Sequence, residues 1–268
     1  MEYLTRFEDD SMCSVKDSTY SNCLINLSRC NQEHKNRIKD SRKTYKDLLN
    51  LLTDIEKKFQ TFSPRYQANI FHSLAKLKTF FPASTFSSLL LSLSNTIHRH
   101  SHLSTFSPQD ISMIVWALDK TGFKHMGLLN RFGHELVQRE LSQAQGRGLD
   151  AFRPQELVTT IRSFAKLGVK NQRLCDRFVV AIIECDMNQF NSQGFANLVW
   201  AFARLGVQNQ ELFDVLAIEL KHRTLRYFSS HEIENTLWAF ATLNISYEGL
   251  YEQLASELCG RGQSVVCV

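Results

Sequence analysis

Glycine and proline are scarce in this chain, which has 11 Gly and 4 Pro among 268 residues. A β-sandwich or barrel turns roughly every 8–12 residues, and its turns draw heavily on these two residue types. The shortage therefore argues against an all-β fold. A strong excess of one charge is also missing, since the net charge is only +4. Such a balance permits a nucleic-acid partner without requiring one.

Paired cysteines and long apolar runs are missing too. The seven Cys are odd in number and contain no C-x-x-C pair, which excludes a disulfide framework and a ribbon-type zinc site and indicates a reducing compartment. The longest uncharged stretch, residues 79–97, is rich in Ser and Thr and too polar for a bilayer. The N-terminus carries Glu2, Glu8, Asp9 and Asp10, which excludes a secretory signal and weakens the case for a transit peptide.

Catalytic motifs are absent as well. The sequence has no Gly-rich phosphate loop, no G-x-S-x-G, no H-E-x-x-H and no kinase signature, so we expect neither an enzyme nor a cofactor nor a small-molecule substrate. Cys23, Cys30 and His34 fit no common zinc spacing, and no metal site is predicted. Two basic stretches, 98–102 and 35–46, are interpreted as solvated surface, with a nucleic-acid contact as the alternative.

A repeated segment dominates what the sequence does contain. Five stretches align without gaps over nineteen residues, with starts 44, 46, 38 and 38 residues apart. Their leading residues are Phe62, Phe106, Phe152, Phe190 and Phe228. As written they read FSPRYQANIFHSLAKLKTF, FSPQDISMIVWALDKTGFK, FRPQELVTTIRSFAKLGVK, FNSQGFANLVWAFARLGVQ and FSSHEIENTLWAFATLNIS. A period of this length without strand signals predicts helical-hairpin repeats.

Each repeat contains signals for where its first helix begins and ends. Ser107 with Asp110, and Ser229 with Glu232, form predicted capping boxes. The leading Phe precedes the cap and faces an apolar residue four positions into the helix, a hydrophobic staple that Gln67 breaks in the first repeat. Proline stands at the expected first helical position at residues 64, 108 and 154. Predicted C-terminal turns lie at residues 122, 168 and 206, all Gly, and at 244, an Asn.

These units predict an all-α fold, an α-solenoid of five tandem helical hairpins of about 38 residues over residues 62–258. A two-helix unit cannot bury both of its apolar faces alone, so neighbouring units must stack. Residues 1–34 are predicted to be disordered, residues 35–61 to form a capping helix, and residues 259–268 to form a tail. Because no polar capping helix follows the fifth repeat, we expect a longer protein or a protein partner at that end.

The signature F-x-x-Q-x-(L/F)-x-N-x-(L/V)-W-A-F-A-x-L-G, clearest in residues 190–208, resembles octotricopeptide repeats and is similar to the helical repeats of FAST-kinase-like proteins. The sequence departs from it at His72, Arg162, Asp119 and Thr121. The resemblance implies RNA binding during maturation, stabilisation or translation of transcripts in mitochondria or chloroplasts. Related repeats in bacteria that live in host cells leave a cytoplasmic, host-directed protein as the alternative.

One face of each first helix holds the candidate RNA-binding residues, because positions i, i+4, i+7 and i+11 lie together. Predicted phosphate-binding residues are Lys76, Lys120, Lys166 and Arg204, which we call the basic column. Predicted base-reading residues are Asn69, Gln109, Gln155, Gln193, Asn197 and Asn235. Stacked helices about 8–10 Å apart would present one such set per repeat to single-stranded RNA.

Each of these columns also has a purely structural interpretation. Lys near a helix C-terminus complements the helix dipole, and Asn can bond a neighbouring helix. The column of Trp116, Trp200 and Trp238 is expected to be inter-repeat core, with base stacking as the alternative. A protein–protein scaffold is the alternative function, and the distribution of charge along the first helices distinguishes it from an RNA-binding module.

Overall fold

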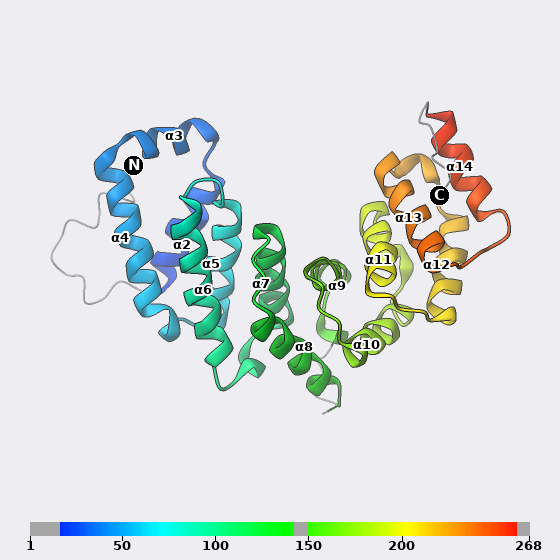
Figure 1. Ribbon diagram of the computed structural model, residues 1–268, viewed down its shortest axis with the longest axis horizontal. Coiled ribbons are helices and arrows are strands. Elements are labelled where there is room, and N and C mark those ends of the chain that lie inside the picture. Colours follow the sequence, from blue (N-terminus) through cyan, green and yellow to red (C-terminus); the bar gives the residue numbers. More distant parts are fainter. Residues whose placement is uncertain (1–16, 142–148, 262–268) are drawn as a thin grey trace. The chain divides into compact units, whose positions relative to one another are not determined.

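The computed structural model describes residues 17–141 and 149–261 (Figure 1). These residues form thirteen α-helices joined by turns and short 3-10 segments, and no strand occurs among them. The all-α prediction is confirmed. The chain divides into two compact units, residues 1–132 and 133–268, with the boundary inside helix α8. None of the helices in the described residues is both long and apolar enough to cross a membrane.

The N-terminal unit contains two layers of helices. Its helices are α2 (Asp17–Arg29), α3 (Gln32–Asp40), α4 (Arg42–Lys58), α5 (Pro64–Lys76), α6 (Ala83–Arg99), α7 (Pro108–Thr121) and the start of α8 (Met126–Leu141). Helix α5 packs between α2 and α7, while α4 packs against α6. First helices therefore stack on first helices, as a solenoid requires.

The C-terminal unit repeats the arrangement. Its helices are the remainder of α8, then α9 (Pro154–Leu167), α10 (Gln172–Ile183), α11 (Ser192–Leu205), α12 (Gln210–His222), α13 (Ser230–Thr242) and α14 (Leu250–Gly260). Helix α11 packs between α9 and α13, and α10 packs against α12 (Figure 1). Each unit thus has one layer of first helices and one of second helices.

The helix boundaries follow the sequence signals closely. The capping boxes at Ser107 and Ser229 are both present, and proline occupies the first turn of α5, α7 and α9. All four predicted C-terminal turns adopt the left-handed conformation, with φ of 71°, 77° and 73° at the glycines and 54° at Asn244. Only at such angles is a residue without Cβ, or an Asn, favoured over other types.

Arginines that directly follow α12 and α14 bind the turns that lead into the fourth and fifth repeats, a role that the sequence did not reveal. The guanidinium of Arg223 donates to the carbonyl oxygens of Phe190 at 2.7 Å and Met187 at 2.6 Å, and pairs with Glu219 at 2.7 Å. Arg261 makes the same contacts one repeat later, to the carbonyls of residues 228 and 225. These turn-binding arginines satisfy carbonyls beside a buried Phe, so their charge is structural.

In the first repeat, Gln67 stands where other repeats have the apolar residue of the hydrophobic staple, and it makes hydrogen bonds instead. Its amide nitrogen donates to the carbonyl of Phe59 at 2.9 Å and to that of Phe62 at 3.1 Å. These two carbonyls are equivalent to those that Arg223 binds in the fourth repeat. The residue at the position of Arg223 in the first repeat is Asn95, so Gln67 supplies the missing donor from the first helix.

The N-terminal region differs from the predicted disorder, because residues 17–29 form helix α2 and residues 32–40 form α3. Helix α2 lies against α5 where the first helix of a preceding repeat would lie. Its Tyr20 ring contacts Phe62 with centroids 5.6 Å apart, as Phe195 contacts Phe228 at 6.3 Å. Helix α4 then leads through a 3-10 turn into Phe62, as α6, α10 and α12 lead into the Phe of the repeat that follows each of them.

Helices α2 and α4 therefore form a sixth, degenerate hairpin. Neither Pro nor Trp of the repeated motif occurs in α2, which is why the sequence pattern missed it. The segment predicted as one capping helix, residues 35–61, is divided by Ser41, which ends α3 and caps α4. Residues 1–16 and 262–268, predicted to be disordered and to form a tail, lie outside the described residues.

Candidate nucleic-acid interface

Four positions of each first helix form the first-helix face, namely those 3, 7, 10 and 14 residues after the leading Phe. In both units every one of these positions is exposed or half-buried in the structure. The basic column occupies the last position, and all four of its residues are exposed. Lys76 and Lys120 lie on the stacked helices α5 and α7, and Lys166 and Arg204 lie on α9 and α11.

The first-helix face contains no carboxylate. In the N-terminal unit it consists of Arg65, Asn69, His72, Lys76, Gln109, Met113, Trp116 and Lys120. In the C-terminal unit it consists of Gln155, Thr159, Arg162, Lys166, Gln193, Asn197, Trp200, Arg204, His231, Asn235, Trp238 and Thr242. At the chain's average of 27 Asp and Glu in 268 residues, twenty positions would hold two acids. Instead the face combines Arg, Lys, amides and aromatic rings, the side chains that bind phosphates and unpaired bases.

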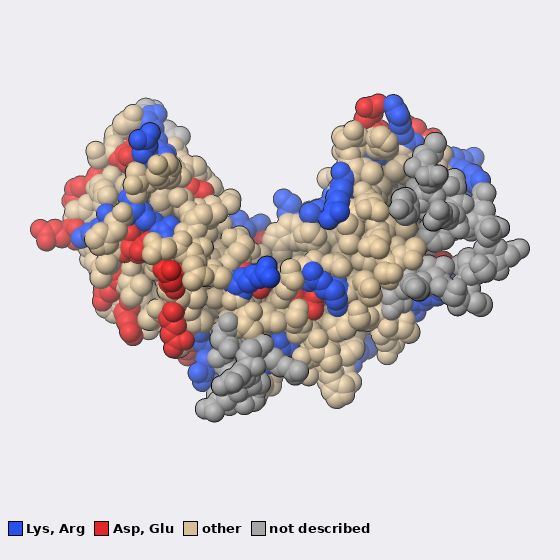
Figure 2. Space-filling view, turned by 180° about the vertical axis from the view of Figure 1, so that it is seen from behind, with Lys and Arg blue, Asp and Glu red and all other residues tan. Residues whose placement is uncertain are grey.

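The rest of the surface is mixed. Figure 2 shows Lys and Arg side chains in separate patches among uncharged and acidic residues on the side of the molecule drawn there. The absence of acids is therefore a property of the first-helix face and not of the surface as a whole. A modest net charge is compatible with a local basic site.

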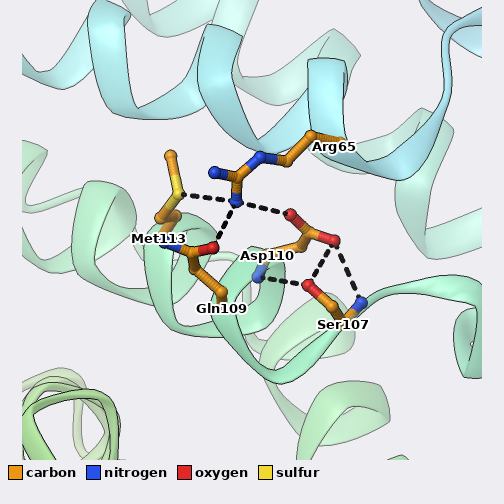
Figure 3. Close-up of polar contacts among 5 residues, drawn as sticks. All are labelled: Arg65, Ser107, Gln109, Asp110 and Met113. Carbon is orange, nitrogen blue, oxygen red and sulfur yellow. Dashed lines mark hydrogen bonds and ion pairs between the residues drawn. The ribbon is translucent and has the colours of Figure 1, made fainter. Parts of the chain in front are cut away.

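Three of the predicted base-reading residues are engaged within the protein. Gln109 accepts a hydrogen bond from Arg65 of the preceding first helix at 2.8 Å (Figure 3). Asn197 accepts from Arg162 at 3.1 Å, again across two first helices, and Asn235 bonds His231 on its own helix. These amides hold adjacent repeats together or brace their own helix, so base reading by them would need these contacts to open.

Arg65 binds more than one group of the second repeat. Its guanidinium also lies 3.3 Å from Asp110, whose carboxylate is 5% exposed and accepts from the backbone and hydroxyl of Ser107 (Figure 3). The carboxylate that completes the capping box is thus neutralised by the neighbouring repeat. Arg65 therefore joins the first repeat to the second.

The other three predicted base readers remain available. Within the described residues, no hydrogen bond joins the side chain of Asn69, Gln155 or Gln193 to another residue. Gln155 and Gln193 are exposed and Asn69 is half-buried. A free amide offers both donor and acceptor to a base edge.

Aromatic residues of adjacent repeats contact one another along the face. His72 and Trp116 lie with ring centroids 4.9 Å apart, and Trp200 and Trp238 lie 6.4 Å apart. The tryptophans are not the inter-repeat core that was expected, since Trp116 and Trp200 are half-buried and Trp238 is 39% exposed. The tenth position of the repeat lies at the solvent edge of the contact between first helices, while Ala117, Ala201 and Ala239 beside it are buried.

His72 is held neutral at physiological pH. Burial, and to a smaller extent the positive charge of Lys76 one turn away, lower the pKa of its imidazole from 6.5 to about 4. A neutral imidazole offers one donor and one acceptor and stacks as a flat ring. In the first repeat it takes the place that Trp holds in the second, fourth and fifth repeats.

Sequence reasoning missed two residues of this face because it missed α2. Asn22 and Arg29 precede Asn69 and Lys76 by the same 47 residues, and both are exposed. Helix α2 packs on α5 as α5 packs on α7, so these residues extend the amide and cation columns by one repeat. The sequence signal that could have revealed these residues is the offset of 47 residues, which is the same in both pairs.

Residues of the other candidate sites, Cys30 and His34 among them, make hydrogen bonds within the protein. Arg131 donates to the carbonyls of His98 and His100 and so fixes the 98–102 stretch. No group of three or more His, Cys, Asp or Glu suited to a metal ion occurs among the described residues, which include Cys23, Cys30 and His34. The first-helix face is thus the strongest candidate interface.

Comparison with protein families gives one match. Residues 61–263 match the family described as RNA-editing substrate-binding complex 6 protein. Among curated proteins, none matches this chain. The matched region begins one residue before the first repeat and extends past the fifth. The resemblance to octotricopeptide and FAST-kinase-like repeats is not confirmed by this comparison. This chain belongs to the RNA-editing substrate-binding complex 6 protein family.

Proposed function

We propose that this protein binds single-stranded RNA through its first-helix face and acts, without catalysing a reaction itself, in a protein complex that processes mitochondrial RNA. The carboxylate-free face of α5, α7, α9, α11 and α13 is the observation that supports RNA binding. The description of its family supports a role in RNA editing, within a multiprotein assembly. RNA editing favours the mitochondrial option over the chloroplast and the cytoplasm.

The proposed contacts divide into two kinds. The basic column and Arg29 would neutralise phosphates, which gives affinity without sequence preference. Asn22, Asn69, Gln155 and Gln193 would meet base edges, and their small number predicts weak selectivity. High selectivity would then come from other members of the complex.

The test is binding of the purified chain to random single-stranded RNA at two salt concentrations. Lys76, Lys120, Lys166 and Arg204 are replaced together by Ala. The matched control replaces Lys46, Lys57, Arg173 and Lys221, which are exposed, lie off the face and remove the same charge. Losing four phosphate contacts should lower affinity at least tenfold and reduce the salt slope, while the control stays close to wild type.

Two outcomes would contradict the proposal. If the wild-type chain does not bind RNA at low salt, the protein–protein scaffold becomes the better explanation. If the two quadruple variants lose affinity equally, RNA is attracted by net charge and the first-helix face is not the site.

A further inference from the structure

Trp238 is an unusual surface residue. It is 39% exposed on α13, although a tryptophan ring gains more from burial than nearly any other side chain. Its indole contacts Trp200 of α11, with centroids 6.4 Å apart and planes inclined by 33°. The guanidinium of Arg162 lies 5.9 Å from the Trp200 ring. Arg162, Trp200 and Trp238 thus form a row across α9, α11 and α13, open at Trp238.

We propose that the Trp200–Trp238 pair is a stacking platform for one unpaired nucleobase of single-stranded RNA, which rests on the proposed function. The base stacks on the open surface of Trp238. It does not enter between the two rings, because a sandwiched base needs parallel rings roughly 7 Å apart, twice the 3.4 Å rise of stacked bases. The Trp200 and Trp238 rings are closer together than this and tilted.

The neighbours of the platform favour a nucleotide. Arg204 lies one turn beyond Trp200 on α11 and is exposed, in the position of a phosphate ligand. Arg162 lies over Trp200 and is held there by Asn197, which fixes the row before any ligand binds. An aromatic surface beside arginine side chains is the arrangement that proteins use for single strands.

One carboxylate is near the platform. Glu234 lies one turn before Trp238 on α13, outside the four face positions, and its carboxylate is 3.9 Å from the His231 imidazole. Its charge repels phosphate on that side of Trp238. The nucleotide is therefore oriented with its phosphate toward α11 and its base toward α13.

Two substitutions of Trp238 test the platform with an oligouridine of about twelve nucleotides as probe. Trp238→Leu keeps apolar bulk but removes the π-surface, and should weaken binding about fivefold or more. Trp238→Phe restores a ring and should recover much of the affinity. Because stacking releases no counterions, the salt slope should be unchanged in both, unlike that of the basic-column variant. Tyr227→Leu, at a 76% exposed aromatic residue outside the first-helix face, is the matched control and should leave the affinity unchanged.

The outcomes separate the two proposals. Wild-type affinity in Trp238→Leu, with lost affinity in the basic-column variant, would overturn the platform and leave the proposed function intact. A change of oligomeric state in Trp238→Leu without a change in RNA affinity would overturn it in favour of a protein contact. If Trp238→Leu loses RNA binding and also has a lowered melting temperature, Trp238→Phe distinguishes lost stacking from lost folding. If Trp238→Phe recovers the wild-type melting temperature but not the RNA affinity, the result counts against stacking.

Discussion

Arg223 donates a 2.7 Å hydrogen bond to the carbonyl of Phe190, 33 residues earlier, and the same pair recurs as Arg261 and Phe228. The second helix of a repeat is thereby fixed to the turn in front of the first helix of that repeat. The Phe ring buries the turn, so without the arginine the carbonyl of Phe190 would lose this donor and that of Met187 would keep only the N–H of Phe190. This contact closes the hairpins of the fourth and fifth repeats.

Replacing Arg223 by Met should lower the free energy of unfolding by about 2–4 kcal/mol. The substitution keeps most of the apolar stem but removes charge-assisted bonds to two carbonyls and leaves Glu219 unpaired. Urea denaturation measures the change. Arg226→Met, on an exposed residue three positions away, is the control and should change stability by under about 0.5 kcal/mol. If Arg223→Met and Arg226→Met lower the free energy of unfolding equally, the loss of a charge explains the effect and the carbonyl contacts do not.

Gln67→Leu should destabilise the protein, although it restores the apolar residue that the repeat pattern calls for. Gln67 is 1% exposed and donates to the carbonyls of Phe59 and Phe62. A leucine would remove this donor from both and leave Phe59 only the N–H of Phe62. Such a loss costs about 1–3 kcal/mol. Gln155→Leu, on an exposed glutamine, is the control. A chain stabilised by Gln67→Leu would mean that the staple outweighs the hydrogen bonds.

The repeat and its boundaries were predictable because capping boxes, helix-starting prolines and left-handed glycines are local signals, and Ser107, Ser229 and Gly206 all behave as expected. The turn-binding arginines were not, because they lie outside the nineteen aligned residues and act across 33 positions. The hydrogen bond from Arg65 to Gln109 was not predictable either, since it depends on how far one helix lies from the next. Helical periodicity assigns a face but not the partners on it.

Tyr20 tests whether α2 is part of the folded domain. It is 2% exposed, contacts Phe62 with ring centroids 5.6 Å apart, and accepts a hydrogen bond from Lys58 at 3.0 Å. Tyr20→Ala should cost about 3–5 kcal/mol, the range for losing a buried aromatic ring. Asn22→Ala, on the exposed side of the same helix, should be close to neutral in stability. If Tyr20→Ala is also neutral, the hairpin of α2 and α4 does not support the first repeat.

His72 predicts a dependence of stability on acid. Its pKa is lowered to about 4 in the folded chain, mainly by burial, while the unfolded chain has the ordinary value of 6.5. Between these values the unfolded state binds more protons, so stability due to His72 is complete above pH 6.5 and is lost as the pH falls toward 4. His72→Gln should flatten this part of the profile, measured by urea denaturation at pH 7 and pH 5.

Lys76→Met tests separately what lowers the pKa of His72. Removing the nearby positive charge should raise the pKa of His72, but only partly, because burial is the larger contribution. Nuclear magnetic resonance titration of the imidazole reports the value directly in both chains. A wild-type His72 that titrates near 6.5 would show that the ring is solvated, and the contact with Trp116 at 4.9 Å would then not persist in solution.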